Sequence, residues 1–278
     1  MTPMLPPSRL RRRKTEGKSQ PDSDNGPPPV DWQGIPLDCR RCDVRRRSHA
    51  DCQLSHACVH DRYALRVDRF FRWNTEQAAE WLGHAYFEVR AIAARYASVF
   101  RLAPLLSDPD ETVRTVVAER VPRRLLGRLT QDPHREVRIR VAQRLDPSVL
   151  VALCRDHDYG VRVWVARRIS RAFLVDMADD PDSQVRVEVA RRLDPAALSV
   201  LAADRDLAVR RVVASRAGPS LLGLMARDPR WEVRWEVAQR ATHTLAERLV
   251  RDEEEEVRTA AASRLAELAS DKTGEGKQ

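Results

Sequence analysis

The dipeptide Val-Arg recurs at a constant interval, and this repeat constrains the fold more than any other feature of the chain. It begins at positions 89, 113, 137, 161, 185, 209, 233 and 257, which defines a constant 24-residue period. A fixed period of this length is typical of stacked repeat architectures, in which each unit packs mainly against its neighbours. We number each repeat from its Val as position zero.

Apolar residues within each repeat predict a helix with one buried face. Positions zero, four, five and eight are apolar in all eight repeats, and position five is always Ala. This spacing places the four side chains on one side of a helix. The invariant Ala indicates that neighbouring helices approach each other closely.

Two helix-start signals appear in the repeats. Asp stands at position minus five in seven repeats, and Pro follows it at positions 109, 133, 181 and 229. Asp as the N-cap with Pro at the first helical position predicts a helix from the Pro to position eight. A second signal at position nine consists of Asp146-Pro147, Asp194-Pro195 and Gly218-Pro219. Only a short α-helix or a 3₁₀-helix fits before the next Asp. We expect no β-strand, and therefore an all-α solenoid of helical repeats.

Composition divides the chain into four segments. We expect a disordered, basic and Pro-rich tail over 1–30 and a four-cysteine module over 31–59. A degenerate capping repeat follows at 60–83, since Leu65-Arg66 lies one 24-residue period before Val89, and the eight repeats cover 84–275. No apolar run approaches the ~20 residues of a membrane helix. No apolar segment of a signal peptide follows the basic N-terminal run, so we expect a cytoplasmic protein.

Four of the five cysteines lie close together in the sequence: Cys39, Cys42, Cys52 and Cys58, with the spacing C-x2-C-x9-C-x5-C. In a reducing compartment such a group indicates a metal site more often than disulfides. Zinc and an iron–sulfur cluster both remain open on this spacing. Neighbouring arginines would balance the negative charge of a cluster: Arg40, Arg41, Arg45, Arg46 and Arg47. Three histidines could replace a cysteine ligand: His49, His56 and His60.

The cysteine group followed by 24-residue repeats resembles the leucine-rich repeat variant proteins. The resemblance covers about 31–275. Its residues are the four cysteines and four elements of each repeat: the Asp-Pro pair, the Val-Arg dipeptide, the Val-Ala or Ala-Ala pair at positions four and five, and the later Leu. The resemblance implies a [4Fe–4S] cluster bound by Cys39, Cys42, Cys52 and Cys58. It also implies a right-handed superhelix of alternating α- and 3₁₀-helices. It implies no defined biochemical activity.

Other conspicuous residues have plain structural interpretations. Cys154 stands at a packing position of its repeat, so we expect a structural thiol and not a fifth ligand. The arginines at positions one and seven, such as Arg114 and Arg120, could form a ladder for phosphates. We expect them instead to pair with the Asp of neighbouring repeats and with backbone carbonyls. Three tryptophans interrupt the repeat pattern and would mark a partner site if exposed: Trp164, Trp231 and Trp235.

The leading functional hypothesis is a non-enzymatic iron–sulfur protein for electron transfer or redox sensing, joined to a scaffold that binds a protein partner. The alternative is a helical-repeat protein that binds nucleic acid, because the net charge is +8 and the isoelectric point is about 9.7. A third hypothesis is a passive scaffold with a structural zinc cap. No catalytic residues are predicted, since no triad, phosphate loop or carboxylate pair stands out.

Overall fold

The computed structural model describes the backbone of residues 26–44 and 51–274. The predicted tail lies outside the described residues up to residue 25, and so do Arg45, Arg46, Arg47 and His49. The contacts of the chain divide it into two compact units, residues 1–75 and 76–278. This division falls inside the segment predicted as a capping repeat, 60–83.

The first unit contains α2 (Ala64–Trp73) and the loops that carry the cysteines. Two isolated antiparallel β-bridges connect its loops: Val30 pairs with Pro36, and Gln53 pairs with Ala57. One face of α2 is buried through Val67, Phe70 and Phe71, and the two phenylalanine rings meet edge to face with their centroids 5.3 Å apart. Helix η1 (Thr75–Trp81) begins at the boundary of the unit.

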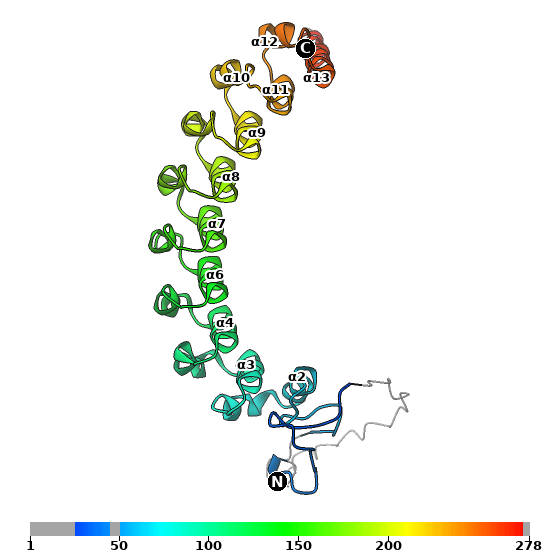
Figure 1. Cartoon of the computed structure of the whole chain (residues 1–278), viewed down its shortest axis with the longest axis vertical. Helices are drawn as coiled ribbons and strands as arrows, with labels where there is room; N and C mark the ends of the chain where they lie inside the picture. Colours follow the sequence, from blue (N-terminus) through cyan, green and yellow to red (C-terminus); the bar gives the residue numbers. More distant parts are fainter. Residues whose placement is uncertain (1–25, 45–50, 275–278) are drawn as a thin grey trace, which may run out of the picture. The chain divides into compact units, whose positions relative to one another are not determined.

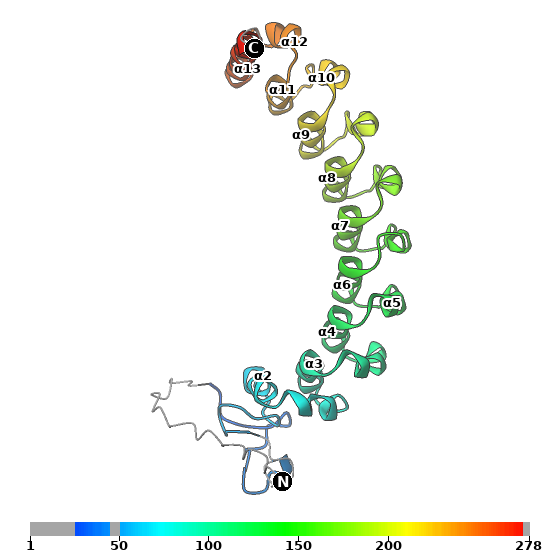
Figure 2. The same cartoon turned by 180° about the vertical axis from the view of Figure 1, so that it is seen from behind.

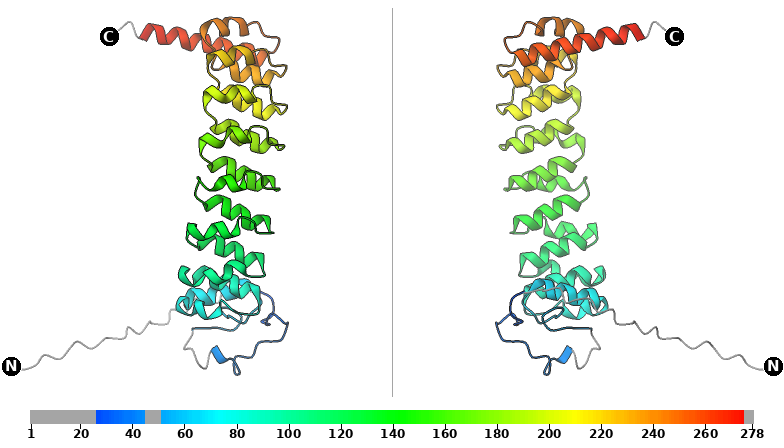
Figure 3. Two further views of the ribbon diagram at one scale, coloured as in Figure 1. Left: turned by 90° about the vertical axis from the view of Figure 1, so that its left-hand side faces the viewer. Right: turned by 90° about the vertical axis from the view of Figure 1, so that its right-hand side faces the viewer.

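The second unit is a stack of helices in two rows (Figures 1 and 2). The first row contains the long helices α3 (Phe87–Tyr96), α4 (Glu111–Arg120), α6 (Arg135–Arg144), α7 (Tyr159–Arg168), α8 (Ser183–Arg192), α9 (Leu207–Arg216), α11 (Trp231–Ala238) and α13 (Glu255–Gly274). Helix α13 has 20 residues and extends past the width of the stack (Figure 3).

The second row contains shorter helices, mostly 3₁₀. They are η2 (Val99–Arg101), η3 (Ala103–Ser107), α5 (Arg123–Leu126), η4 (Gly127–Leu129), η5 (Leu150–Leu153), η6 (Arg171–Phe173), η7 (Val175–Met177), η8 (Pro195–Leu201), α10 (Pro219–Met225) and α12 (His243–Leu249). No β-strand occurs among the described residues, and no helix in this part of the chain is long and apolar enough to cross a membrane. The predicted alternation of α-helices with short helices is therefore confirmed.

The predicted apolar positions form the core of the stack. In α4 and at its C-cap, for example, Val113, Val117, Ala118 and Val121 are completely buried. The last repeat departs from this pattern, because the position-five residue Ala262 of α13 is exposed. In the inner repeats the carbonyl at position five contacts an arginine of the next repeat, as Ala142 does with Arg168, and among the described residues α13 has no such neighbour.

The predicted N-cap is wrong by two residues. In α4 the cap is Asp110, at position minus three, and its carboxylate accepts a hydrogen bond of 2.8 Å from the N–H of Thr112. Asp158, Asp182 and Asp206 cap α7, α8 and α9 in the same way. The long helices therefore begin at position minus two rather than at the Pro, and most of them end at position seven instead of eight. The second-row signal is correct for η8, since Asp194 caps it.

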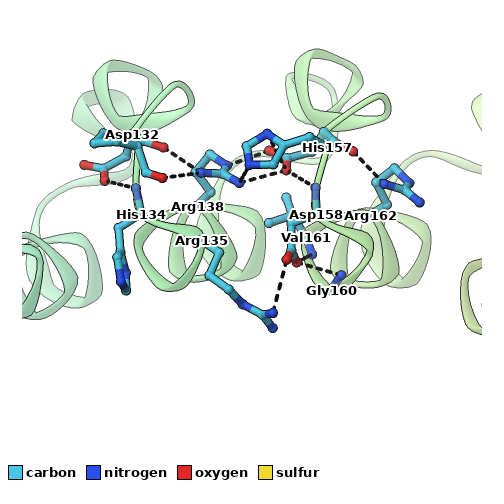
Figure 4. A network of polar contacts seen from close by, with 11 residues as sticks. Asp132, His134, Arg135, Arg138, His157, Asp158, Gly160, Val161 and Arg162 are labelled. Atoms are coloured by element: carbon cyan, nitrogen blue, oxygen red, sulfur yellow. Dashed lines mark hydrogen bonds and ion pairs between the residues drawn. The ribbon is translucent and has the colours of Figure 1, made fainter.

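The Asp at position minus five is instead part of a ladder of ion pairs between repeats. Arg138 donates from Nε and Nη2 to both oxygens of Asp156, at 2.7 and 3.0 Å, and from Nη1 to the Asp132 carbonyl at 2.7 Å (Figure 4). The other pairs of the ladder are Arg90–Asp108, Arg114–Asp132, Arg162–Asp180, Arg186–Asp204, Arg210–Asp228 and Arg234–Asp252. The Arg–Asp pairing expected from the sequence is confirmed for position one.

Position seven carries a second row of arginines. Each donates to carbonyl oxygens at the C-terminal end of the long helix in the preceding repeat: Arg168, for example, reaches the Ala142 oxygen at 2.6 Å and the Leu145 oxygen at 2.9 Å. The equivalent residues are Arg120, Arg144, Arg192, Arg216 and Arg240. These carbonyls have no partner within their own helix, so the guanidinium groups cap the helix ends.

Candidate metal centre

The first two cysteines lie on one turn. The Arg41 N–H donates to the Asp38 carbonyl at 3.1 Å, and the Asp38 carboxylate accepts a 2.9 Å bond from the Arg40 N–H. This aspartate-closed turn places Cys39 inside the turn and Cys42 directly after it. Asp38 also pairs with the Arg40 guanidinium, and this hydrogen bond holds the pKa of Asp38 below its ordinary value.

The second pair of cysteines flanks a small hairpin. Gln53 and Ala57 exchange both backbone hydrogen bonds, at 2.9 and 2.8 Å, and Ser55 at the tip has a φ of 66°. In an antiparallel pair the next residues outward lie opposite each other, with Cβ atoms about 4.5–5.5 Å apart. These residues are Cys52 and Cys58. The C-x5-C spacing therefore brings the two thiols to the same end of one hairpin.

Three of the four cysteines line one cavity of about 200 Å³. Its walls are Leu37, Asp38, Cys39, Arg41, Cys42, Cys58 and His60. Cys52 is not in the wall itself and is half-buried. Among the described residues, no three His, Cys, Asp or Glu side chains lie close enough together to hold a single metal ion.

Cys58 is the buried member of the group. Burial raises the pKa of its thiol to about 12, although the backbone N–H groups of His60 and Asp61 favour the thiolate. A thiol with this pKa is protonated at neutral pH, so a metal that binds it must displace the proton. Amide groups that point at a sulfur also stabilise the negative charge of a metal-bound thiolate.

A buried ion pair supports the loop of Cys58. Arg66 in α2 donates to the Asp61 carboxylate at 2.9 Å, and the two side chains are only 1% and 0% exposed. The backbone joins the same elements, because the Cys58 N–H donates to the Arg66 carbonyl at 3.1 Å. The sequence pattern predicts that Arg66 belongs to a capping repeat. The structure shows that it also fixes the position of a candidate ligand.

Asn74 supports the other arm of the hairpin. Its side-chain oxygen accepts from the Asp51 N–H at 2.9 Å, and its amide nitrogen donates to the Asp51 carbonyl at 2.8 Å. The same nitrogen donates to the Phe70 carbonyl, and Asn74 is only 3% exposed. Asn74 thus ties the residue before Cys52 to the end of α2. Neither Asp61 nor Asn74 was predicted, because nothing in a single sequence distinguishes them from other polar residues.

Of the remaining candidate ligands, only His60 is among the described residues of the cavity wall. His56 Nδ1 lies 3.3 Å from Arg69 Nη1, and its ring centroid lies 5.5 Å from that of Trp73 with the planes tilted by 34°, so its ring is engaged with α2. His60 lines the cavity together with the cysteines. Cys154 belongs to the second unit, where it is half-buried and its sulfur lies 3.9 Å from the Leu150 carbonyl oxygen.

The tryptophans of the stack are half-buried. Trp164 has the Arg167 guanidinium above its ring at 5.0 Å from the centroid, and Arg167 also pairs with Glu188 at 3.0 Å. Trp231 and Trp235 are likewise neither fully exposed nor buried. Part of their surface therefore packs within the stack.

Comparisons with known proteins agree with both units. A family model described as "LRV protein FeS4 cluster" matches residues 29–80, a range that contains all four cysteines. The structure of "a leucine-rich repeat variant with a novel repetitive protein structural motif" is 40% identical. The match covers 82% of this chain and 99% of that one, with a TM-score of 0.77.

A further relative is the "uncharacterized 27.7 kDa protein in nifB 3'region" of Rhodobacter capsulatus. It is 50% identical over 100 residues, which are 35% of this chain. The chain spans 40% of the length of that relative. Together the matches assign an iron–sulfur domain to the cysteine-bearing segment and a helical-repeat scaffold to the stack.

Proposed function

Because the chain belongs to the leucine-rich repeat variant family, we propose that Cys39, Cys42, Cys52 and Cys58 bind a [4Fe–4S] cluster. We further propose that this cluster serves electron transfer or redox sensing in the reducing cytoplasm, without catalysis by the protein itself. The solenoid would then bind the protein partner. The observation that carries the proposal is the arrangement of the cysteines: three line one cavity, and the fourth, Cys52, adjoins the bridge between Gln53 and Ala57 that Cys58 follows.

The cavity and the family match favour a cluster over zinc. In a zinc site all four sulfurs lie about 2.3 Å from one ion, so they converge on a single point. In a [4Fe–4S] cluster each thiolate binds a different iron, and the ligands therefore stand farther apart. Three of the cysteines line a cavity of about 200 Å³, and the family model that matches residues 29–80 is described as an FeS4 cluster, which supports the cluster as the occupant.

The surroundings suit a negatively charged group that changes charge by one electron. A bound cluster supplies one-electron chemistry. Arg41 in the cavity wall provides positive charge, and the amides of His60 and Asp61 point toward the sulfur of Cys58. Both features stabilise the more negative, reduced form and so raise the potential. Burial of Cys58 limits access of water and oxidants on that side.

The first experiment is anaerobic purification with a visible spectrum and quantification of iron, sulfide and zinc. We expect a brown protein with about four iron and four sulfide per chain. Cys39→Ser, Cys42→Ser, Cys52→Ser and Cys58→Ser should each lose most of the colour. Cys154→Ser is the matched control, since its thiol belongs to the other unit, and it should keep the full iron content. A colourless protein with one tightly bound zinc ion would contradict the proposal.

A second experiment separates a redox role from a structural one. Iron–sulfur clusters have potentials between roughly −700 and +450 mV. We expect reversible one-electron reduction in this window, followed by the visible spectrum, with the far-ultraviolet circular dichroism unchanged. A cluster that is redox-inert throughout the window, and whose removal unfolds the first unit, would show a structural role only.

A further inference from the structure

The C-terminal ends of the long helices form a basic edge, which we call the arginine edge. It consists of the position-seven arginines Arg120, Arg144, Arg168, Arg192, Arg216 and Arg240. Three exposed arginines at the start of the second row add to it: Arg123, Arg124 and Arg171. Arg123 acts electrostatically on Arg144 and Arg168, and Arg171 acts on Arg192. The additional arginines therefore lie beside the helix-end row.

The guanidinium groups of this edge keep hydrogen-bonding capacity for a ligand. In Arg120, Arg168, Arg216 and Arg240 both carbonyl contacts within the described chain start from Nη1. Each of these side chains is at least partly exposed, so Nε and Nη2 remain available as donors. This pair of donors matches the two oxygens of a carboxylate.

The charge of the edge remains positive after its local partners are counted. A helix C-terminus carries about −0.5 elementary charge, and each capping guanidinium carries +1. Among acidic residues, Asp146 and Asp194 lie at the same end of the repeats, as starts of second-row turns. Glu119 and Glu188 also act on Arg144 and Arg192, but they already pair with Arg140 and Arg167. The repeats that carry Arg123, Arg124 and Arg171 at this place, instead of an aspartate, therefore form the most basic part of the edge.

The opposite edge has the other sign. There the position-one arginines already pair with the aspartates of the ladder, for example Arg162 with Asp180 at 2.7 Å. The N-cap aspartates remain half-exposed along that edge: Asp110, Asp158, Asp182 and Asp206. The two edges of the stack therefore differ in charge, and an acidic partner is attracted to one edge and repelled by the other.

We propose that the arginine edge binds an extended, acidic polypeptide segment of the partner protein. Neighbouring helices of a row pack about 8–10 Å apart, so the guanidinium groups recur at about this interval. A chain extended in the polyproline II conformation has three residues per turn and rises about 3.1 Å per residue. Side chains i and i+3 then lie on the same side about 9 Å apart, so one carboxylate in three meets each arginine. A straight DNA duplex fits less well, because each strand returns to the same side only once in about 34 Å.

This inference rests on the proposed function for its biological meaning, since it supplies the surface by which the scaffold holds its redox partner. The test uses the full chain and a labelled peptide of about 21 residues with Glu at every third position, the period of a polyproline II chain. Fluorescence anisotropy measures its affinity at about 50 mM NaCl and at higher salt. We expect binding that weakens with salt, and weaker binding of a peptide with the same glutamates in one continuous block.

Variants locate the surface. Arg123→Gln, Arg124→Gln and Arg171→Gln together should weaken binding about tenfold, since three exposed ion pairs of modest strength are lost together. The matched control removes three exposed arginines at position minus six, before the long helices begin: Arg155→Gln, Arg227→Gln and Arg251→Gln. The control should stay within about twofold of the unchanged protein.

Several results would overturn the inference: equal losses in the two triple variants, no peptide binding at about 50 mM NaCl, or tighter binding of a DNA duplex of about 20 base pairs at the same salt. The last result would identify the edge as a nucleic-acid surface. Iron and sulfide measured in the same samples separate this test from the cluster proposal. A colourless protein that still distinguishes the two triple variants keeps the binding surface and loses only the cluster.

Discussion

At the scale of single residues, the Arg–Asp ladder places charges in the interior and satisfies their hydrogen bonds. Arg186 and Asp204 are 5% and 6% exposed and lie 2.7 Å apart. Arg186 also donates to the Asp180 carbonyl at 2.8 Å, and Asp204 accepts from the Asp206 N–H at 2.8 Å. Burying a charge costs several kcal/mol unless it is paired in this way. Removal of one partner therefore leaves the other charge uncompensated.

Asp204→Ala should lower the free energy of unfolding by about 3 kcal/mol, because Arg186 then remains buried without its carboxylate. Arg230→Gln is the control: it breaks the exposed pair with Glu232 and should cost less than about 1 kcal/mol. Urea unfolding followed by circular dichroism measures both. The double variant Asp204→Ala with Arg186→Met should recover part of the loss. Equal stability of Asp204→Ala and Arg230→Gln would contradict this account.

At the scale of elements, α2 is the support of the cysteine loops. Its Arg66 fixes Asp61 and the backbone of Cys58, while Asn74 at its end holds both backbone groups of Asp51. The two arms of the Gln53–Ala57 hairpin are therefore attached to opposite ends of one helix. Rigid attachment of this kind determines how well a group of ligands is preorganised.

Asn74→Ala should weaken iron retention about tenfold, since supporting residues of metal sites typically contribute this much affinity. The physical reason is that the Asp51 N–H and carbonyl lose their partners next to Cys52. Thr75→Ala is the matched control, because it removes a single 3.1 Å bond to the Phe71 carbonyl at the same helix end. Iron per chain after anaerobic reconstitution and desalting provides the measurement. The same iron content in both variants would refute a positioning role for Asn74.

The elements differ in how far sequence alone predicts them. In the stack each contact recurs once in every 24-residue repeat, so the buried positions and the Arg–Asp pairing are visible as a pattern. The N-cap was still misassigned, because Asp-Pro resembles a helix start while the arginine of the preceding repeat already binds that carboxylate. In the cysteine unit each contact occurs once. The Asn74 contact with Asp51, 23 residues away, has no counterpart from which to infer it.

At the scale of the whole molecule, the ladder links stability to pH. Burial opposes ionisation of Asp204 and Asp252, but the guanidinium groups of Arg186 and Arg234 and the N–H groups of Asp206 and Glu254 outweigh it. The pKa values of both aspartates are therefore held below their ordinary value. A carboxylate with a lowered pKa stabilises the fold above its unfolded pKa, and this contribution is lost as the pH falls.

The stack should therefore keep its full stability down to about pH 5 and lose it progressively between about pH 4 and 2. Urea titrations at several pH values, followed by far-ultraviolet circular dichroism, measure the slope. Asp204→Asn should show a shallower dependence, because it removes one of the groups that must be protonated. Unchanged stability between pH 5 and pH 3 would disprove this link.

The reach of the ladder also sets how the chain tolerates changes in length. Each arginine binds an aspartate 18 residues later, and every repeat offers the same aspartate to the repeat before it. Loss or duplication of one 24-residue segment thus rejoins two surfaces that already fit each other. Any other length breaks the register of every contact at the junction. The number of repeats is consequently free to change by recombination in whole units, while the junction chemistry stays constant.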